Sequence, residues 1–112
     1  MNNLLTIDVE DWFHTSALDP YLGPNQWDYL ESRVEPNVHR FLEILATHQT
    51  RATFFILGWV AERYPHLVKE IAALGHEIGS HGYRHRLIYD LTPAQFKDYL
   101  GRSKKILEDL DN

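Results

Sequence analysis

The hydrophobic pattern of the chain predicts three short strands separated by longer amphipathic segments. Residues 4–9 and 52–57 are apolar and contain β-branched or aromatic side chains, which is typical of buried strands. Residues 76–81 predict a third, shorter strand. Near-continuous apolar strands favour a parallel sheet with both faces covered.

Apolar positions at helical spacing predict two helices between these strands. The first begins near Pro36, because proline suits the first turn of a helix. Its apolar stripe comprises Val38, Phe41, Leu42 and Leu45. The second covers about residues 60–74, with a break near Tyr64 because Pro65 follows. Gly75 is the expected C-terminal cap.

A last helix is predicted to follow Thr92. Thr92 would be its N-cap, Pro93 its first residue and Gln95 the partner in a capping box. Gly101 should weaken this helix by about 1 kcal/mol relative to alanine. The expected inner face comprises Phe96, Leu100, Ser103, Leu107 and Leu110.

Residues 12–35 interrupt the pattern with proline and glycine, yet hold several aromatic side chains, so we expect a long aromatic loop folded over another part of the protein. The order strand–loop–helix–strand–helix–strand–helix predicts an α/β fold of parallel β/α units with right-handed crossovers. Three units are too few for an eight-stranded barrel, which needs roughly 250 residues. The sequence therefore predicts a small open domain or the first part of a larger fold.

Composition narrows the classes of function. The 112 residues suit one domain, and the absence of cysteine excludes disulfides, cysteine-based zinc sites and thiol nucleophiles. A net charge of −5 argues against non-specific binding to nucleic acid. No apolar run approaches the ~20 residues of a membrane span. The N-terminus lacks the features of a signal peptide, so a cytoplasmic location is expected; the oligomeric state is left open.

Candidate catalytic residues follow the first and third predicted strands. Asp8 and Glu10 are two residues apart at the end of the first strand, so they should point to the same side. His81 and His85 are four apart after the third strand, so one helical turn would bring their rings together. Both groups should share the carboxyl edge of the sheet.

Two imidazoles and a carboxylate with open positions form a ligand set for catalytic Zn²⁺, Fe²⁺ or Co²⁺. A second carboxylate that does not bind the metal could accept a proton from water. Each group alone is weak evidence, because acidic residues and histidines are common in loops. The remaining histidines lack a partner at ligand spacing; helix surfaces are expected for His39, His48 and His66, and the entrance of the third strand for His76, whereas His14 has no assigned place.

Three segments resemble polysaccharide deacetylases of carbohydrate esterase family four, the family of rhizobial chitooligosaccharide deacetylases. They are TIDVEDWF at 6–13, RATFFILGWVAERYP at 51–65 and GHEIGSHGYRHRLIYDLTPAQF at 75–96. The DVED form of the first segment is most similar to the subgroup found in bacterial exopolysaccharide gene clusters. The resemblance implies the first part of a distorted (β/α) barrel, incomplete in this chain, that removes N-acetyl groups from the amino sugars of a polysaccharide or oligosaccharide.

The resemblance also assigns roles to individual residues. Asp8 matches the catalytic base, and His81 and His85 match the paired histidines that hold a divalent metal, with Zn²⁺ expected. The metal-binding carboxylate is Glu10 or Asp11, and the spacing from Asp8 favours Glu10. The family often has serine or threonine where this chain has Gly82.

Substrate contacts and the completeness of the site are further expectations. Trp12, Phe13 and Trp27 could stack on sugar rings, although packing of the long loop explains them equally well. The family's later motifs, an Arg-Pro segment and a C-terminal histidine acting as general acid, are absent from these residues. Two alternatives therefore stay open: an inactive fragment or interaction module, and a related amidohydrolase acting on a cyclic amide such as allantoin.

Overall fold

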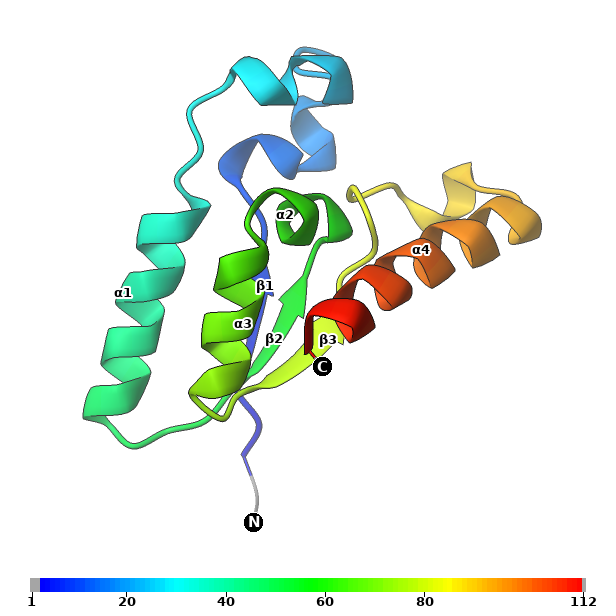
Figure 1. Ribbon diagram of the computed structural model, residues 1–112. Coiled ribbons are helices and arrows are strands. Elements are labelled where there is room, and N and C mark those ends of the chain that lie inside the picture. Colours follow the sequence, from blue (N-terminus) through cyan, green and yellow to red (C-terminus); the bar gives the residue numbers. More distant parts are fainter. Residues whose placement is uncertain (1–2, 112) are drawn as a thin grey trace.

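The sheet has three parallel strands, and its register brings their carboxyl ends level. In the computed structural model, which describes residues 3–111, the strands are β1 (Thr6–Val9), β2 (Thr53–Ile56) and β3 (Glu77–Ser80), in that order across the sheet (Figure 1). Val9 lies opposite Ile56, and Ile56 lies opposite Ser80. The residues that follow β1 and β3 therefore emerge at the same edge, as the sequence predicted.

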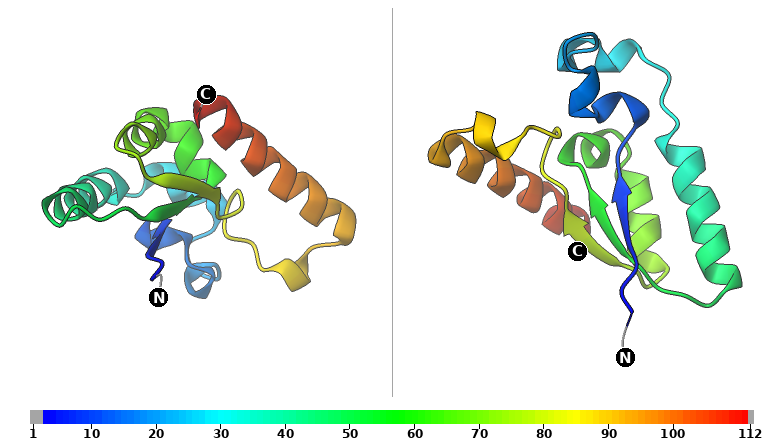
Figure 2. Two further views of the ribbon diagram at one scale, coloured as in Figure 1. Left: turned by 90° about the horizontal axis from the view of Figure 1, so that it is seen from below. Right: turned by 180° about the vertical axis from the view of Figure 1, so that it is seen from behind.

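Within the described residues, helices cover one face of this sheet. They are α1 (Val34–Thr47), α2 (Gly58–Arg63), α3 (Pro65–Ala73) and α4 (Pro93–Asp111), and α3 contacts both α1 and α4 (Figure 2). The other face carries Asp8, Phe55 and Gly79, none of which is buried. The expectation that both faces are covered is therefore wrong for residues 3–111.

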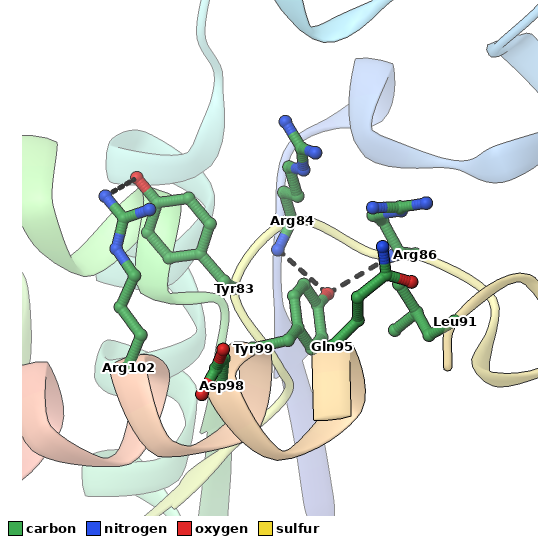
Figure 3. A pocket seen from close by; sticks show the side chains of 8 residues that line it. All are labelled: Tyr83, Arg84, Arg86, Leu91, Gln95, Asp98, Tyr99 and Arg102. Atoms are coloured by element: carbon green, nitrogen blue, oxygen red, sulfur yellow. Dashed lines mark hydrogen bonds between the residues drawn. The ribbon is translucent and has the colours of Figure 1, made fainter. Parts of the chain in front are cut away.

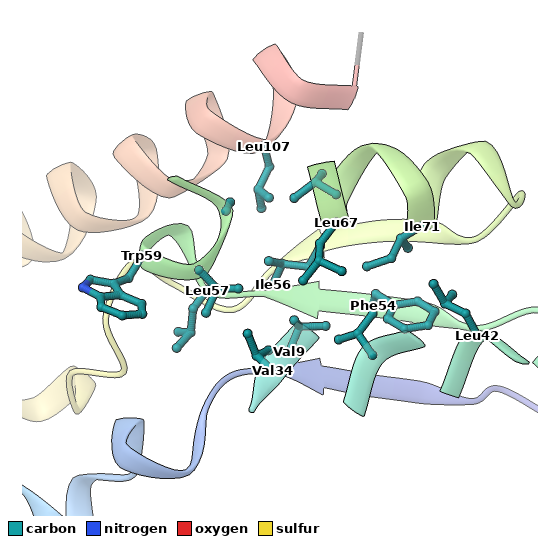
Figure 4. Packing of buried hydrophobic residues seen from close by; sticks show 14 of the residues in the cluster. Val9, Val34, Leu42, Phe54, Ile56, Leu57, Trp59, Leu67, Ile71 and Leu107 are labelled. Atoms are coloured by element: carbon teal, nitrogen blue, oxygen red, sulfur yellow. The ribbon is translucent and has the colours of Figure 1, made fainter. Parts of the chain in front are cut away.

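The core lies between the sheet and the helices. Phe54 and Ile56 of β2 and Ile71 of α3 are at most 1% exposed, and Leu107 attaches α4 to the same cluster (Figure 4). Burying side chains of this size contributes about 1.5–3 kcal/mol each. This shared core fixes α4 against β3, which matters for the loop that joins them.

Several predicted boundaries are confirmed. The break falls at Tyr64, between α2 and α3, and Gly75 follows α3 with a φ of +87°, a value that glycine adopts without strain. Thr92 and Gln95 form the predicted capping box: Gln95 N–H donates to Thr92 Oγ1, and Thr92 N–H donates to Gln95 Oε1. Helix α1 begins two residues before Pro36.

Two residues depart from the predicted apolar faces. Phe41 of α1 is 47% exposed and Leu100 of α4 is 40% exposed, because each lies at the margin of its helix's buried stripe. The described residues include no helix long and apolar enough to cross a membrane.

The segment after β1 is the predicted aromatic loop, and it contains three short 3₁₀ helices. These are η1 (Trp12–His14), η2 (Ser16–Leu18) and η3 (Pro24–Tyr29). The segment packs at the carboxyl edge of the sheet, next to β1 and α2 (Figure 1). A fourth short 3₁₀ helix, η4 (Ile88–Asp90), precedes α4.

Candidate metal centre

Three predicted ligands meet beyond the carboxyl ends of β1 and β3. Glu10 Oε2 lies 3.1 Å from His85 Nε2 and 3.5 Å from His81 Nε2. One potential ligand atom from each of the three residues lies within 4.8 Å of the others. Asp8 is beside them, with Oδ2 3.9 Å from His81 Nε2 and a half-exposed side chain. The two sequence segments therefore converge on one place.

The contacts between these atoms are those of ligands that surround a common centre. Glu10 Oε2 and His81 Nε2 are buried and have no hydrogen-bond partner among the described residues, although they lie close together. Zinc–ligand bonds of about 2.0–2.1 Å in a tetrahedron place neighbouring ligand atoms about 3.3 Å apart. The observed 3.1 and 3.5 Å agree with that spacing, so these side chains fit a divalent cation.

The Glu10 carboxyl and the His81 imidazole shift each other's pKa in opposite directions. The close approach of His81 lowers the pKa of the Glu10 carboxyl, against the opposing effect of burial, and the charges of His85 and His81 lower it further. The same contact with Glu10 raises the pKa of His81, although burial opposes it. Both shifts favour the charged forms of the pair, a deprotonated Glu10 beside a protonated His81.

The histidine pair comes together through a loop and not through the helical turn that the spacing predicted. Gly82 has a φ of +80° and His85 a φ of +61°, so the chain reverses at two left-handed residues. The two imidazole rings stand edge to face, with centroids 5.2 Å apart. A left-handed non-glycine residue is strained, and such strain persists only where surrounding contacts hold it.

Tyr99 of α4 supplies one such contact, which sequence reasoning missed. Its hydroxyl oxygen accepts hydrogen bonds from the backbone N–H groups of Arg84, at 2.9 Å, and Arg86, at 3.1 Å (Figure 3). These two residues flank His85 in the sequence. One phenol therefore holds the backbone on both sides of His85, a candidate ligand.

Two serines supply a second brace. Ser103 Oγ of α4 donates to the carbonyl of Gly82 at 3.0 Å, and Ser80 Oγ accepts from Gly82 N–H at 3.2 Å. The two hydroxyls lie 2.7 Å apart, and Ser103 is fully buried. A Cβ at Gly82 would meet the Tyr99 ring at 2.7 Å and φ is +80°, so a serine or threonine at this position would be strained and would have to displace Tyr99.

Asp11, the alternative ligand, has a different place. It is 5% exposed, and its carboxylate accepts hydrogen bonds from Trp12 N–H, Arg33 N–H and the hydroxyl of Ser32. These contacts fasten the start of η1 to the residues before α1. With its oxygens engaged in this way, Asp11 is a structural cap, and Glu10 is the carboxylate that faces the histidines.

His14 supports the same turn from inside the core. Its Nδ1 accepts the backbone N–H of Asp11 at 2.7 Å, and the ring is fully buried against Trp27 and Trp59. Burial among these rings lowers the pKa of His14 to about 4, so the ring is neutral at neutral pH. Nothing in the spacing of His14 identified this role, because its partner is a backbone amide.

The predicted sugar-stacking residues separate into two groups. Trp12 is 47% exposed, with its indole N–H donating to the carbonyl of Glu31. Phe13 is 0% and Trp27 is 2% exposed. Of the two interpretations left open for Phe13 and Trp27, their burial supports packing of the loop, because both rings pack with Trp59 in the core.

The other histidines lie away from the centre. His39 and His66 of the helix surfaces contact Glu70 and Glu35, with Nε2–Oε2 distances of 2.7 and 2.8 Å. His76 lies at the entrance of β3, where its Nδ1 accepts the backbone N–H of Ala52. These placements confirm the predictions made for His39, His66 and His76.

The family assignment follows from comparison with known proteins. The model of the family described as polysaccharide deacetylase matches residues 25–112. The chain belongs to this family. The matched region includes His81 and His85 but begins after Asp8 and Glu10. The predicted family is thereby confirmed, whereas the exopolysaccharide subgroup stays a prediction.

Individual relatives show how much of the domain this chain represents. A peptidoglycan-N-acetylglucosamine deacetylase of Bacillus cereus is 37% identical over 71 residues, which cover 63% of this chain and 26% of the relative. A protein of Mycobacterium smegmatis, described as a candidate polysaccharide deacetylase, has a solved structure that matches 96% of this chain with a TM-score of 0.79 and 29% identity, over 38% of its own length.

A solved pseudoenzyme of carbohydrate esterase family four from Bacillus anthracis is also similar, with a TM-score of 0.69 and 26% identity over 96% of this chain and 30% of its own. The chain thus spans between a quarter and two fifths of the length of these three proteins. The α/β fold of parallel units, as part of a larger deacetylase fold, is confirmed.

Proposed function

We propose that the protein containing this chain removes N-acetyl groups from the amino sugars of a polysaccharide, using a divalent metal held by Glu10, His81 and His85. The convergence of these three side chains beside Asp8, in a chain of the polysaccharide deacetylase family, is the observation that carries the proposal. The peptidoglycan deacetylase named among the relatives supports an acetamido sugar as the substrate class.

The residues present fit a divalent cation such as Zn²⁺. One carboxylate and two imidazoles, with at least one position left open, form a usual catalytic zinc set. When bound, such an ion polarises the acetamide carbonyl and makes a nearby water molecule more acidic. The protein supplies the rigid frame: β1 positions Glu10, while Tyr99 and Ser103 hold the loop of the histidines.

We assign the role of general base to Asp8. It lies on the open face of the sheet, half exposed, and its Oδ2 is 3.9 Å from His81 Nε2. From there its carboxylate can accept a proton from water that attacks the acetyl carbonyl. No histidine follows His85 in the sequence, so the proton for the departing amine is not assigned to a residue of this chain.

The test separates metal binding from proton transfer. Asp8→Asn should keep about one equivalent of zinc and abolish acetate release from a chitooligosaccharide or a peptidoglycan fragment by the full-length protein. Glu10→Gln, His81→Ala and His85→Ala should lose both the metal and the activity. Retained activity in Asp8→Asn would show that the assigned base is wrong.

Two controls sharpen this experiment. Asp19→Asn removes an exposed carboxylate from the same long segment, after η2, and should change neither metal content nor acetate release. Allantoin should not be consumed, because the named relatives support acetamido sugars and not cyclic amides. A protein that binds zinc at these residues yet releases no acetate would favour the non-catalytic alternative, of which the similar pseudoenzyme is an example.

A further inference from the structure

A basic cavity lies next to the candidate metal centre, between the histidine loop and α4. It has a volume of about 330 Å³, within the range of small-ligand sites. Its lining includes Arg84, Arg86 and Arg102 but a single acidic residue, Asp98 (Figure 3). A concentration of positive charge is unusual in a chain whose net charge is −5.

Two of these arginines are available to a ligand. Arg102 is engaged, since its guanidinium lies 3.3 Å from Glu62 and 3.0 Å from the Tyr83 hydroxyl. Among the residues that the structure describes, Arg84 and Arg86 have no carboxylate within 4.0 Å. Figure 3 shows both side chains on the loop, among the residues that line the cavity.

The backbone beneath these two side chains is fixed. Tyr99 Oη accepts the N–H groups of both Arg84 and Arg86, so the spacing of their Cα atoms does not depend on a ligand. Fixed attachment points reduce the entropy lost when a guanidinium pair closes on an anion. The planar guanidinium suits a carboxylate, to which it donates two parallel hydrogen bonds.

The cavity adjoins the candidate catalytic centre. Arg86 and Tyr99 line both this cavity and a second hollow of about 270 Å³, which His81 and His85 also line. A ligand group in the basic cavity therefore lies within reach of a glycan chain whose acetamido sugar occupies the metal centre. Acidic groups found on N-acetylated glycans include the carboxylates of uronic acids and of the lactyl ether of muramic acid.

We propose that Arg84 and Arg86 bind a carboxylate on the substrate, so that the protein prefers N-acetylated glycans that also carry acidic sugars. This inference rests on the proposed function for its choice of a glycan. It predicts selectivity for acidic over neutral chains of the same length, a property that neither the metal ligands nor Asp8 would produce.

Equilibrium binding tests the inference without requiring turnover. We compare hyaluronan tetrasaccharide with chitotetraose, and the N-acetylglucosaminyl–N-acetylmuramic acid disaccharide with chitobiose, by isothermal titration calorimetry at low salt, using the zinc-loaded Asp8→Asn protein so that the ligands are not hydrolysed. At least one acidic ligand should bind about ten-fold more tightly than its neutral match, the gain expected for one charge-assisted bidentate contact. A preference for hyaluronan would identify a uronic acid as the bound group, and a preference for the disaccharide would identify muramic acid.

Variants assign the preference to the cavity. Arg84→Gln with Arg86→Gln should reduce the preference to about one-fold while zinc binding is retained, and Arg40→Gln, at an exposed position of α1, should leave it unchanged. The inference would be overturned if neither acidic ligand bound more tightly than its neutral match, or if neither bound at all. A preference that survives the double substitution would also overturn it. Failure of acetate release with this preference intact would instead count against the proposed function alone.

Discussion

Tyr99 shows how a residue outside the candidate ligand set can determine its geometry. Its hydroxyl accepts the backbone N–H groups of Arg84 and Arg86, the residues on either side of His85, whose backbone is left-handed. Tyr99→Phe removes both hydrogen bonds but keeps the ring, so the protein should fold while its zinc affinity falls about ten-fold, as expected for loss of an outer-shell contact. Competition with a chromophoric chelator measures this affinity.

Tyr89→Phe is the matched control, because Tyr89 is 79% exposed on η4 and its hydroxyl has no hydrogen-bond partner among residues 3–111. It should leave zinc affinity unchanged. Equal affinities for the Tyr99→Phe and unaltered proteins would mean that the loop holds His85 without the phenol.

His14 should make folding sensitive to mild acid. Its pKa is lowered to about 4 by burial, whereas in the unfolded chain it returns to 6.5. Between these values the unfolded chain binds a proton that the folded protein does not, so the free energy of unfolding decreases as the pH falls. The decrease should amount to roughly 3 kcal/mol between about pH 6.5 and 4, with no further loss from this residue below pH 4.

Urea denaturation at several pH values measures this effect. His14→Asn keeps an acceptor for the N–H of Asp11 but has no group that titrates, so it should lower stability overall and flatten the pH dependence. A His14→Asn protein with the same loss of stability from pH 6.5 to 4 would assign the acid sensitivity to other groups.

Single residues also mark the limit of sequence reasoning at this site. Glu10, His81 and His85 could be predicted together because the ends of parallel strands share one edge of the sheet. Tyr99, Ser103 and His14 could not, because each acts on a backbone amide or carbonyl that no spacing rule identifies. The sequence could not decide whether Phe13 and Trp27 stack on sugars or pack within the protein, because burial of an aromatic side chain depends on tertiary packing.

Among the elements, α4 and the loop that it contacts each contain a glycine, and the two positions have opposite requirements. Gly82, in the loop that α4 braces, has a φ of +80° and faces Tyr99, whereas Gly101 within α4 has open space around it. Gly82→Ala should lower the free energy of unfolding by roughly 1–3 kcal/mol, because alanine is strained there and meets the phenol. Gly101→Ala should raise it by about 1 kcal/mol.

The two substitutions are the same chemical change, so thermal or urea denaturation of both proteins isolates the effect of position. Zinc affinity should fall only in Gly82→Ala, because only that residue shapes the histidine loop. Similar stability changes for both variants would contradict the left-handed conformation assigned to Gly82.

Helix and strand positions were largely predictable, and the connection after β3 was not. The break at Tyr64 and the start of α4 follow from proline and capping residues, which act locally. The spacing of His81 and His85 suggested a helical turn, but the loop reverses through two left-handed residues held from α4. The local spacing of histidines gives no information about the hydrogen bonds of Tyr99, which lies fourteen residues after His85.

For the whole molecule, the alternation of strands and helices was sufficient to predict a parallel α/β arrangement. It did not predict that one face of the sheet is uncovered within residues 3–111, because near-continuous apolar strands do not distinguish a covered face from one that borders a barrel interior. Asp8 lies on that open face, where a substrate can reach it.

Metal binding should stabilise this molecule as a whole, because its ligands come from segments more than seventy residues apart that separate on unfolding. Zinc at about 100 times its dissociation constant should add roughly 2.7 kcal/mol to the free energy of unfolding. Glu10→Gln should abolish the gain, while Glu43→Gln, at an exposed position of α1, should retain it. Equal gains in both variants would place the stabilising ion elsewhere.

The most direct test is anomalous diffraction at the zinc absorption edge from crystals of the protein grown with one equivalent of Zn²⁺. We expect one strong peak about 2.0–2.2 Å from a Glu10 carboxylate oxygen and from an imidazole nitrogen of both His81 and His85. A zinc peak at the surface pair of His39 and Glu70, or none near Glu10, would contradict the metal centre proposed for this chain.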